Sequence, residues 1–551
     1  MENVLNINKI LLAQINTISC NVEFNKNRAI EVIKQGIENN CEMVVFPKNF
    51  LVSNDIGNVL ERFNFISNQV KIAVEELVQY SSKIAILIGA INDEFYFLNE
   101  QEKIKIDNNS NKIFDFKNVK FQILSSYEEK KENVDIVLDL NPYYSRYLAD
   151  SEKHNEILKY IEKNHVKYLF LNQIGAYDEF VYAGLSRYYD EFFNLKACAK
   201  SFEEENFIVE FQKEQELDLF SKKLLLTKDK KVFSLDYSDD LERIYKTTVL
   251  GLRDYFSKNG FKRAVLGLSG GLDSTICSVL LADAIGKENV LGVFMPSKLT
   301  SSQSQIDASS LAKNLGINYI EVPIKEMQEC ISDNFDNNFQ QISNFWNDKF
   351  SQSYTQDNIQ ARLRAMILWG IANEYPSAIT IATSDKSEGY MGYATINGDM
   401  SGGIAPIIDI TKTKLFALAC WMNKNREIKN AIPQSIIEKP PGAELAINPE
   451  TGKTLLAEEA LMPYEFMDEV IYRIENLNQT FDIMLKDRFL YENCNKIDTE
   501  IKKTWLKKFF RRYNNAIYKG YILPPGIMAD RNTNNKARYK QFITSKIEYY
   551  R

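Results

Sequence analysis

The chain has 551 residues, 45% of them hydrophobic and 26% charged, which exceeds a single compact core and predicts two or three globular domains. Its formal net charge of -7 argues against a nucleic-acid partner, because phosphate binding needs a dense basic surface. Seven scattered cysteines without CxxC pairs predict reduced thiols. No apolar run reaches 18 residues and no leader pattern opens the chain, so we expect a cytoplasmic protein without a membrane partner.

Residues 1–215 alternate short apolar runs with amphipathic segments, a pattern that predicts an α/β domain. The apolar runs predict strands at 9–15, 43–46, 84–88, 136–140 and 168–172. The amphipathic segment 27–39 predicts a helix. The only two histidines, His154 and His165, fall in one polar helical stretch and are expected on a solvated face. Their scarcity argues against a Ser-His-Asp triad and against a histidine-bound metal.

A charged, weakly periodic segment at 216–240 predicts a linker to a second α/β domain, residues 241–551. This domain opens with a helix from Leu241 that is expected to end at Gly260. Residues 332–357 are polar with interleaved aromatic side chains, and we expect this stretch to be mobile or covered by a partner.

The strongest motif is AVLGLSGGLDSTICSVLLADAIG, which predicts a strand at 264–268, a glycine turn at 269–273 and a helix with Ile276, Val279 and Leu280 on one face. Glycines in such a turn let the backbone approach phosphate oxygens, and the helix N-terminus favours negative charge there. Asp273 at the start of the helix can hold the magnesium ion that accompanies ATP. A Walker loop needs a lysine that is missing here, so the motif predicts another class of nucleotide loop.

SGGLDS resembles the pyrophosphate loop of the N-type ATP pyrophosphatases, a group that includes GMP, asparagine and NAD synthetases and tRNA-thiolating enzymes. The segments DNIQARLRAMILWGIANEY, TSDKSEGY, NGDMSGG, DITKTK, KPPGAEL and AIYKGYILPPG follow it. From about Leu241 to Pro525 the chain thereby resembles the NAD synthetases. The resemblance implies an enzyme that uses ATP and Mg²⁺ to adenylate the carboxylate of deamido-NAD, which ammonia then converts into the carboxamide of NAD.

The resemblance also implies the residues of the site. It assigns to ATP the residues Ser269, Gly270, Gly271, Leu272, Asp273, Ser274, Thr383 and Lys412. It assigns to deamido-NAD the residues Asn358, Glu388, Asp399 and Lys519, and it implies Asp273 and Glu388 as metal ligands. Ser384 and Asp385 depart from the Gly-Asn that the family has at these positions. Lys386 is expected to meet phosphate charge, and Lys439 begins the segment that closes over the substrates. For Arg362 and Arg364 the sequence leaves phosphate contact and solvent exposure open.

The N-terminal part, roughly residues 8–212, resembles nitrilase-type amidases, the glutamine-hydrolysing half of two-domain NAD synthetases. KILLAQINTISCNVEFNKNRAIEVIKQGIENNCEMVVFP and NQIGAYDEFVYAGLS carry this resemblance. Such amidases use a glutamate base, a lysine and a cysteine nucleophile. Here Lys48 stands in place of the glutamate, and Ser125, or else Ser126, in place of the cysteine. We therefore predict that this domain is an inactive pseudoenzyme, and whether Lys103 or Lys105 replaces the catalytic lysine stays open.

The predicted fold is α/β throughout, a nitrilase-like sandwich followed by a doubly wound parallel sheet of the ATP pyrophosphatase type. A homo-oligomer, dimer or larger, is implied by the resemblance. Three functions follow. The first is NAD synthesis with free ammonia. The second is NAD synthesis from glutamine through an unorthodox site or a separate amidase subunit. The third is a non-catalytic nucleotide-binding protein, against which the intact phosphate loop argues.

Overall fold

A computed structural model of the chain describes residues 6–53, 63–107, 112–127, 133–146, 148–212, 240–342, 354–442 and 456–530. The chain divides into two compact units, Met1–Lys231 and Val232–Arg551. The expected linker at 216–240 lies outside the described residues except for its last residue, and so does most of the second half of the 332–357 stretch. Among the described helices, none has both the length and the apolar character needed to cross a bilayer.

The first unit contains two six-stranded sheets. The first has the order β14 (Glu205–Glu210), β1 (Lys9–Gln14), β2 (Met43–Val45), β3 (Ala85–Gly89), β4 (Phe95–Asn99) and β5 (Glu102–Ile106). The second has the order β13 (Leu195–Cys198), β12 (Arg187–Tyr189), β9 (Lys167–Phe170), β8 (Ile136–Asp139), β7 (Val119–Ile123) and β6 (Ile113–Phe116). A hairpin pairs β10 (Ile174–Tyr177) with β11 (Phe180–Ala183).

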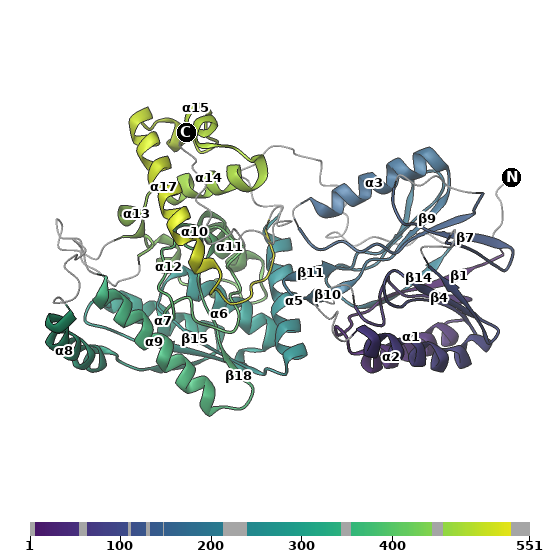
Figure 1. Ribbon diagram of the computed structural model, residues 1–551, viewed down its shortest axis with the longest axis horizontal. Helices are drawn as coiled ribbons and strands as arrows, with labels where there is room; N and C mark the ends of the chain where they lie inside the picture. The colour runs from purple at the N-terminus through teal and green to yellow at the C-terminus, as the bar shows by residue number, and fades with distance from the viewer. Residues whose placement is uncertain are drawn as a thin grey trace. The chain divides into compact units, whose positions relative to one another are not determined.

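The two sheets pack face to face, with helices on both outer faces (Figure 1). Ile10 and Val45 of the first sheet share a core with Phe121 and Leu138 of the second. The first sheet is covered by α1 (Val22–Glu38), α2 (Phe63–Val78) and the short η2 (Gln79–Ser82), and the second by α3 (Ala149–Asn164). Because β1 to β3, β8 and β9 are buried on both faces, they form the apolar runs that predicted them.

The second unit is built on a four-stranded parallel sheet in the order β17 (Asn318–Glu321), β16 (Val290–Phe294), β15 (Arg263–Gly267) and β18 (Ala378–Thr380). The helices around it are α5 (Leu241–Asn259), α6 (Leu272–Ile285), η3 (Lys287–Asn289), α7 (Ser302–Leu315), α8 (Lys325–Ile342), α9 (Thr355–Glu374), α11 (Lys412–Asn425) and α12 (Gln434–Glu438). Helix α6 packs on one face of β15, and Val265 on its other face joins a core with α8 and α9. The sheet is therefore covered on both sides.

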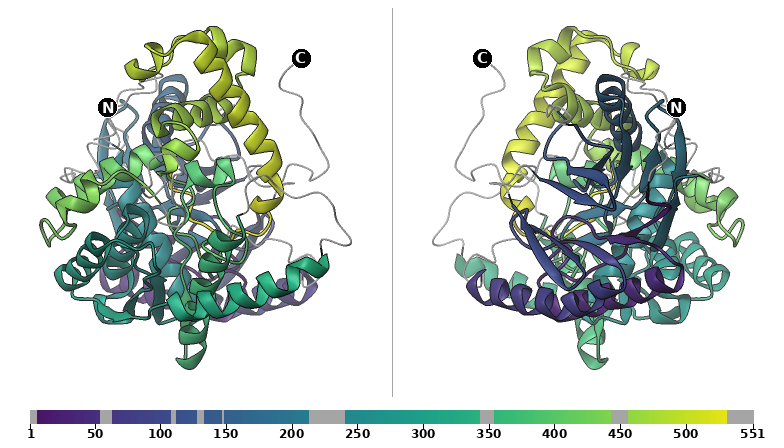
Figure 2. Two further views of the ribbon diagram at one scale, coloured as in Figure 1. Left: turned by 90° about the vertical axis from the view of Figure 1, so that its left-hand side faces the viewer. Right: turned by 90° about the vertical axis from the view of Figure 1, so that its right-hand side faces the viewer.

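A second group of helices has its own core around Phe466 and Phe509. Its members are α10 (Lys386–Met391), α13 (Ala457–Ala460), α14 (Tyr464–Leu477), α15 (Phe481–Lys486), α16 (Glu492–Asn495) and α17 (Thr499–Gly520). Helix α17, drawn in yellow in Figure 2, packs against α10. Since α10 directly follows the loop after β18, this helical group attaches to one edge of the parallel sheet.

One of three local expectations is wrong. Helix α6 buries the expected face of Ile276, Val279 and Leu280, and it buries Cys277 and Ser278 as well, because it lies between the sheet, α5 and α11. His154 does not lie on a solvated face, because its Nδ1 is 2.7 Å from the hydroxyl of Tyr189 beneath α3. Helix α5, by contrast, ends at Gly260 in the left-handed conformation as expected.

Candidate functional site

The phosphate loop lies where the strand order of the parallel sheet reverses. β15 has β16 on one side and β18 on the other, because the chain runs outward from β15 through β16 and β17 and then crosses back to β18. The loop 268–271 follows β15, and the segment 381–385 follows β18. Ligands of doubly wound sheets bind in this crevice at the carboxyl ends of the strands. The fold thus brings the loop and the TSDKSE segment to the same position.

The backbone of the loop is held in a shape that a side chain would disturb. Gly270 has a φ of 74°, and a Cβ atom there would lie 2.3 Å from the carbonyl oxygen of Ser304. The hydroxyls of Ser269 and Ser274 are 3.1 Å apart across the turn. Gly271 caps α6 in an extended conformation, and its carbonyl accepts hydrogen bonds from Ser274 and Thr275. The N-terminus of α6 is consequently presented as an anion-binding end.

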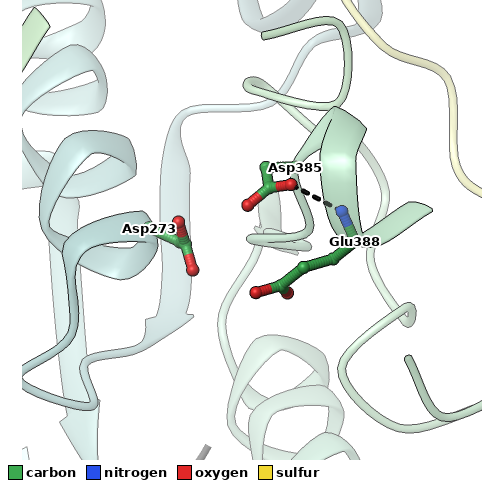
Figure 3. Close-up of side chains that lie close together, drawn as sticks. All are labelled: Asp273, Asp385 and Glu388. Atoms are coloured by element: carbon green, nitrogen blue, oxygen red, sulfur yellow. Dashed lines mark hydrogen bonds between the residues drawn. The ribbon is translucent and has the colours of Figure 1, made fainter. Parts of the chain in front are cut away.

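Three carboxylates meet next to this loop (Figure 3). The side chains of Asp273, Asp385 and Glu388 point toward one another, and their oxygens lie within 4.8 Å of each other. Asp273 begins α6, Asp385 is the N-cap of α10, and Glu388 lies in the first turn of α10. Among the residues that the structure describes, this is the one group of acidic, histidine or cysteine side chains that converges as metal ligands do.

The ammonium of Lys412 contacts all three carboxylates. Its Nζ lies 2.8 Å from Asp273, 2.6 Å from Asp385 and 3.0 Å from Glu388, and the side chain is 1% exposed. Burial lowers the pKa of this lysine, but the three negative charges outweigh burial and raise the pKa well above its usual value. Burial raises the pKa of both Asp273 and Asp385 against the opposing charge of Lys412. The site is therefore a strongly charged, desolvated cluster.

Helix α14 fixes the start of α11, where Lys412 lies. The carboxylate of Asp468 accepts hydrogen bonds from the backbone N–H of Thr413 at 2.9 Å and from its hydroxyl at 2.7 Å. Asp468 also accepts a hydrogen bond from Ser387, whose hydroxyl oxygen in turn accepts the N–H of Lys412. Tyr464 donates to Glu388 at 2.9 Å. Backbone contacts thus hold the base of the Lys412 side chain while its ammonium points into the cluster.

Three of the four residues that the resemblance assigns to deamido-NAD, Asn358, Asp399 and Lys519, lie in or contact the segment 392–399. Thr395 links two of them, because its hydroxyl donates to Asn358 at 2.8 Å and its N–H donates to Asp399 at 2.7 Å. Lys519 on α17 donates to the carbonyls of Gly392 and Ala394 at 2.8 and 2.7 Å. Glu388 belongs instead to the carboxylate cluster. Burial lowers the pKa of Lys519.

The remaining synthetase positions have mixed outcomes. Thr383 is half-buried in the segment after β18, two residues before Asp385. The expectation that Lys386 meets phosphate is wrong, because its Nζ is buried 2.7 Å from Glu475, with further acidic groups nearby. Arg362 is exposed and donates to the carbonyl of Ile396. Lys439 donates to Ser304 beneath the phosphate loop at 2.7 Å, and the segment 443–455 that follows it lies outside the described residues.

The amidase positions lie at the ends of strands in the first unit. Lys48 follows β2 and forms an ion pair of 2.9 Å with Asp93. Ser125 follows β7 and is exposed. Lys103 and Lys105 lie on β5, where Lys103 pairs with Glu75 and Lys105 pairs with Glu94 at 2.7 Å. Lys48, which the resemblance places at the position of the general base, is thus a cation paired with an aspartate.

Asp385 had no predicted role, and the structure places it inside the cluster. One local signal was available. In DKSE an aspartate stands three residues before a glutamate, which is typical of a helix N-terminus, and the Asp385 side chain does accept the N–H of Glu388 at 2.9 Å. The contact with Lys412, 27 positions further along the chain, could not be read from this pattern.

A parallel sheet with a glycine-rich anion loop and converging carboxylates at its switch point defines a nucleotide-binding α/β protein. The sequence model of the NAD synthase family matches residues 244–510. The glutamine-dependent NAD(+) synthetase of Aquifex aeolicus is 30% identical over 537 residues, covering 85% of this chain and 90% of the relative. That of Thermotoga maritima is 30% identical over 524 residues, with 84% and 88% covered. The chain belongs to the family of two-domain, glutamine-dependent NAD synthetases.

Solved structures agree on the fold. The crystal structure of a glutamine-dependent NAD(+) synthetase from Cytophaga hutchinsonii has a TM-score of 0.78 at 17% identity, with 98% of each chain covered. A glutamine-dependent NAD+ synthetase from Acinetobacter baumannii, solved with adenosine diphosphate, has a TM-score of 0.64 at 22% identity, covering 93% of this chain and 94% of that one. The predicted nitrilase-like sandwich and the doubly wound parallel sheet are thereby confirmed.

Proposed function

We propose that this chain is an NAD synthetase that amidates deamido-NAD at the expense of ATP. The observation that carries the proposal is the junction of the phosphate loop with Asp273, Glu388 and Lys412 at the switch point of the sheet. Family membership supports the same activity. The third hypothesis, a non-catalytic nucleotide-binding protein, offers no reason for a buried lysine and three carboxylates to converge at the phosphate loop.

In the proposed reaction an oxygen of the nicotinate carboxylate attacks the α-phosphorus of ATP, and the bond to pyrophosphate breaks. The acyl-adenylate that forms is attacked by ammonia, the amide is made, and AMP leaves. N–H groups at the start of α6 and the hydroxyls of Ser269 and Ser274 are placed to bind the phosphates that depart. We expect Lys412, at the edge of this loop, to stabilise the negative charge that develops on the phosphates.

The carboxylates of Asp273 and Glu388 fit a divalent cation, because Mg²⁺ prefers oxygen ligands and one ammonium balances only one of the three charges. A bound Mg²⁺ would supply Lewis-acid stabilisation to the polyphosphate. We propose that Asn358, Asp399 and Lys519 bind deamido-NAD, since they gather around one segment beside the cluster. No nucleophilic side chain is required, which agrees with the scarcity of histidine in the chain.

The source of the ammonia is the open part of the proposal. The names of the relatives favour glutamine, the alternative in the sequence analysis, over free ammonia. Free ammonia is favoured by Lys48 and Ser125, because an ammonium paired with Asp93 cannot act as a base and a serine without a base is a poor nucleophile. Loss of glutaminase activity and assembly into a homo-oligomer both stay predictions.

The test is NAD formation from ATP, Mg²⁺ and deamido-NAD with unlabelled ammonium and glutamine labelled with ¹⁵N in its amide. The mass of the carboxamide of NAD then reports the donor directly. Unlabelled product supports the free-ammonia proposal, and labelled product supports glutamine. No product with either donor overturns NAD synthesis and favours the binding protein.

Two variants sharpen this test. Asp273→Ala is expected to abolish synthesis from both donors, because it removes a proposed metal ligand. Ser125→Ala separates the two glutamine routes. If Ser125 is an unorthodox nucleophile, the variant loses incorporation of the label and retains synthesis from ammonium. If a separate amidase subunit supplies the ammonia, the variant behaves as the unmodified chain does.

A further inference from the structure

The ammonium of Lys412 takes the position that a cation would take among three carboxylates. Its distances to Asp273, Asp385 and Glu388 lie between 2.6 and 3.0 Å, and the carboxylate oxygens themselves lie within 4.8 Å of one another. Oxygens at 2.0 to 2.6 Å from a divalent ion lie about this close together. The same small volume cannot hold both the ammonium and a divalent ion in contact with all three groups.

Asp385 adds a negative charge that the family pattern does not have at this position, where an asparagine is usual. One carboxylate oxygen of Asp385 caps α10 by accepting the N–H of Glu388, and the other faces Lys412. Asparagine could also accept the N–H of Glu388. Its second side-chain atom toward Lys412 would then be an amide N–H₂ or a neutral oxygen, neither of which carries a negative charge. The aspartate is fully buried, so its charge acts inside the site and not on solvent.

We propose that Asp385 is a third carboxylate of the divalent-cation site, and that the ammonium of Lys412 and the cation compete for the same position among the three carboxylates. Binding of the cation then displaces the Lys412 ammonium, which becomes available to the phosphates of ATP. The inference rests on the proposed function only in naming ATP as the nucleotide. Binding of the cation and binding of ATP should therefore strengthen each other, because the displaced Lys412 ammonium gains the phosphates as a new anionic partner.

The attachment of Lys412 suits such an exchange. Its backbone is fixed by Ser387 and, through Thr413, by Asp468, so the start of α11 does not have to move. The four-carbon stem can change rotamer while its base stays in place. The ring of Tyr464, 5.3 Å from the ammonium, offers a cation–π contact on one side of the cluster.

The experiment measures Mn²⁺ binding to the full chain in the absence of nucleotide, by electron paramagnetic resonance of free Mn²⁺. Lys412→Met is expected to bind Mn²⁺ at least about tenfold more tightly than the unmodified chain, given the one to three pKa units by which an adjacent charge typically changes a carboxylate. Adding Asp385→Asn to Lys412→Met is expected to reverse the gain by about tenfold. Asparagine preserves the cap of α10, so the double variant tests the charge and not the helix.

Lys386→Met is the matched control. Lys386 is also buried and also lies near three carboxylates, of Glu475, Asp409 and Asp530. Those carboxylates do not converge as ligands among the residues that the structure describes. This variant is therefore expected to leave Mn²⁺ affinity unchanged. Thermal unfolding with and without Mn²⁺ shows whether each variant is folded, and Mn²⁺ should stabilise Lys412→Met more than the unmodified chain.

Weaker or unchanged Mn²⁺ binding by folded Lys412→Met overturns the competition. An equal gain in Mn²⁺ affinity in Lys386→Met overturns the assignment of the competition to the cluster of Asp273, Asp385 and Glu388. A double variant that binds as tightly as Lys412→Met removes Asp385 from the site. All of these outcomes are independent of NAD formation, so failure of the synthesis assay with the expected Mn²⁺ results would reject the proposed function alone.

Discussion

The phosphate loop allows a test in which two glycines with the same backbone conformation are compared. Gly270 and Gly260 have φ values of 74° and 75°. Alanine at either position costs about 1 to 2 kcal/mol for the left-handed conformation. A Cβ atom at Gly260 meets nothing within 4 Å, whereas one at Gly270 lies 2.3 Å from the oxygen and 2.9 Å from the Cα of Ser304. These are backbone atoms of α7, so a rotamer change cannot relieve the contact.

Ordinary van der Waals contact begins at 3.4 Å, and the phosphate loop must therefore shift by about 1 Å to accept Gly270→Ala. A displacement of this size at a reacting centre costs on the order of 100-fold in rate. We expect kcat/KM for ATP to fall at least about 100-fold in Gly270→Ala and to change less than about twofold in Gly260→Ala. The free energy of unfolding should fall by about 1 to 2 kcal/mol in Gly260→Ala, as urea denaturation measures. Equal losses of synthesis in both variants would refute the argument from the Ser304 contact.

Three further predictions concern other parts of the chain. Asp273→Asn should reduce NAD formation from either donor at least about 100-fold, and titration with Mg²⁺ should show a raised requirement for the ion. Lys519→Met should raise KM for deamido-NAD more than KM for ATP, and equal effects on both would contradict its assignment. Burial and Arg187 lower the pKa of His154 from the usual 6.5 to about 4. Between pH 6.5 and pH 4 the unfolded chain therefore binds more protons than the folded chain. The free energy of unfolding should fall as the pH decreases through this range, by at most about 3 kcal/mol. His154→Gln should make the urea midpoint less dependent on pH in this range, and an unchanged dependence would assign the effect to other groups.

The fold could be predicted from the sequence where burial is complete. Strands such as β1 and β8 lie between two covered faces, so they appear as uninterrupted apolar runs of strand length. The small helices α13, α15 and α16 could not be predicted in the same way. They are four to six residues long and have no full period of a helical pattern, and packing around Phe466 and Phe509 determines them.

The site could be predicted as far as a local motif reaches. SGGLDS specifies the strand, turn and helix N-terminus of the loop, and the structure has all three. The error at Lys386 arose because neighbouring motif positions were taken to face the same ligand. Lys386 and Glu388 are two residues apart on α10, which rotates them by about 200° around the helix axis. Glu388 consequently faces Lys412, and Lys386 faces Glu475.

Lys48 and Asp385 both depart from the family pattern, but the ion pairs that they form differ. In the first unit Lys48 stands where the resemblance to nitrilase-type amidases implies a glutamate, and its charge is taken up by Asp93 at 2.9 Å in an ion pair. In the second unit Asp385 replaces an amide, and its charge is taken up by Lys412 at 2.6 Å, inside a cluster that two other carboxylates share. On our proposals, the first difference removes the base that glutamine hydrolysis needs, whereas the second adds a ligand to the cation site that ATP chemistry needs. We therefore expect the choice of nitrogen donor to depend on the first unit, and the activation of the carboxylate to depend on residues of the second unit.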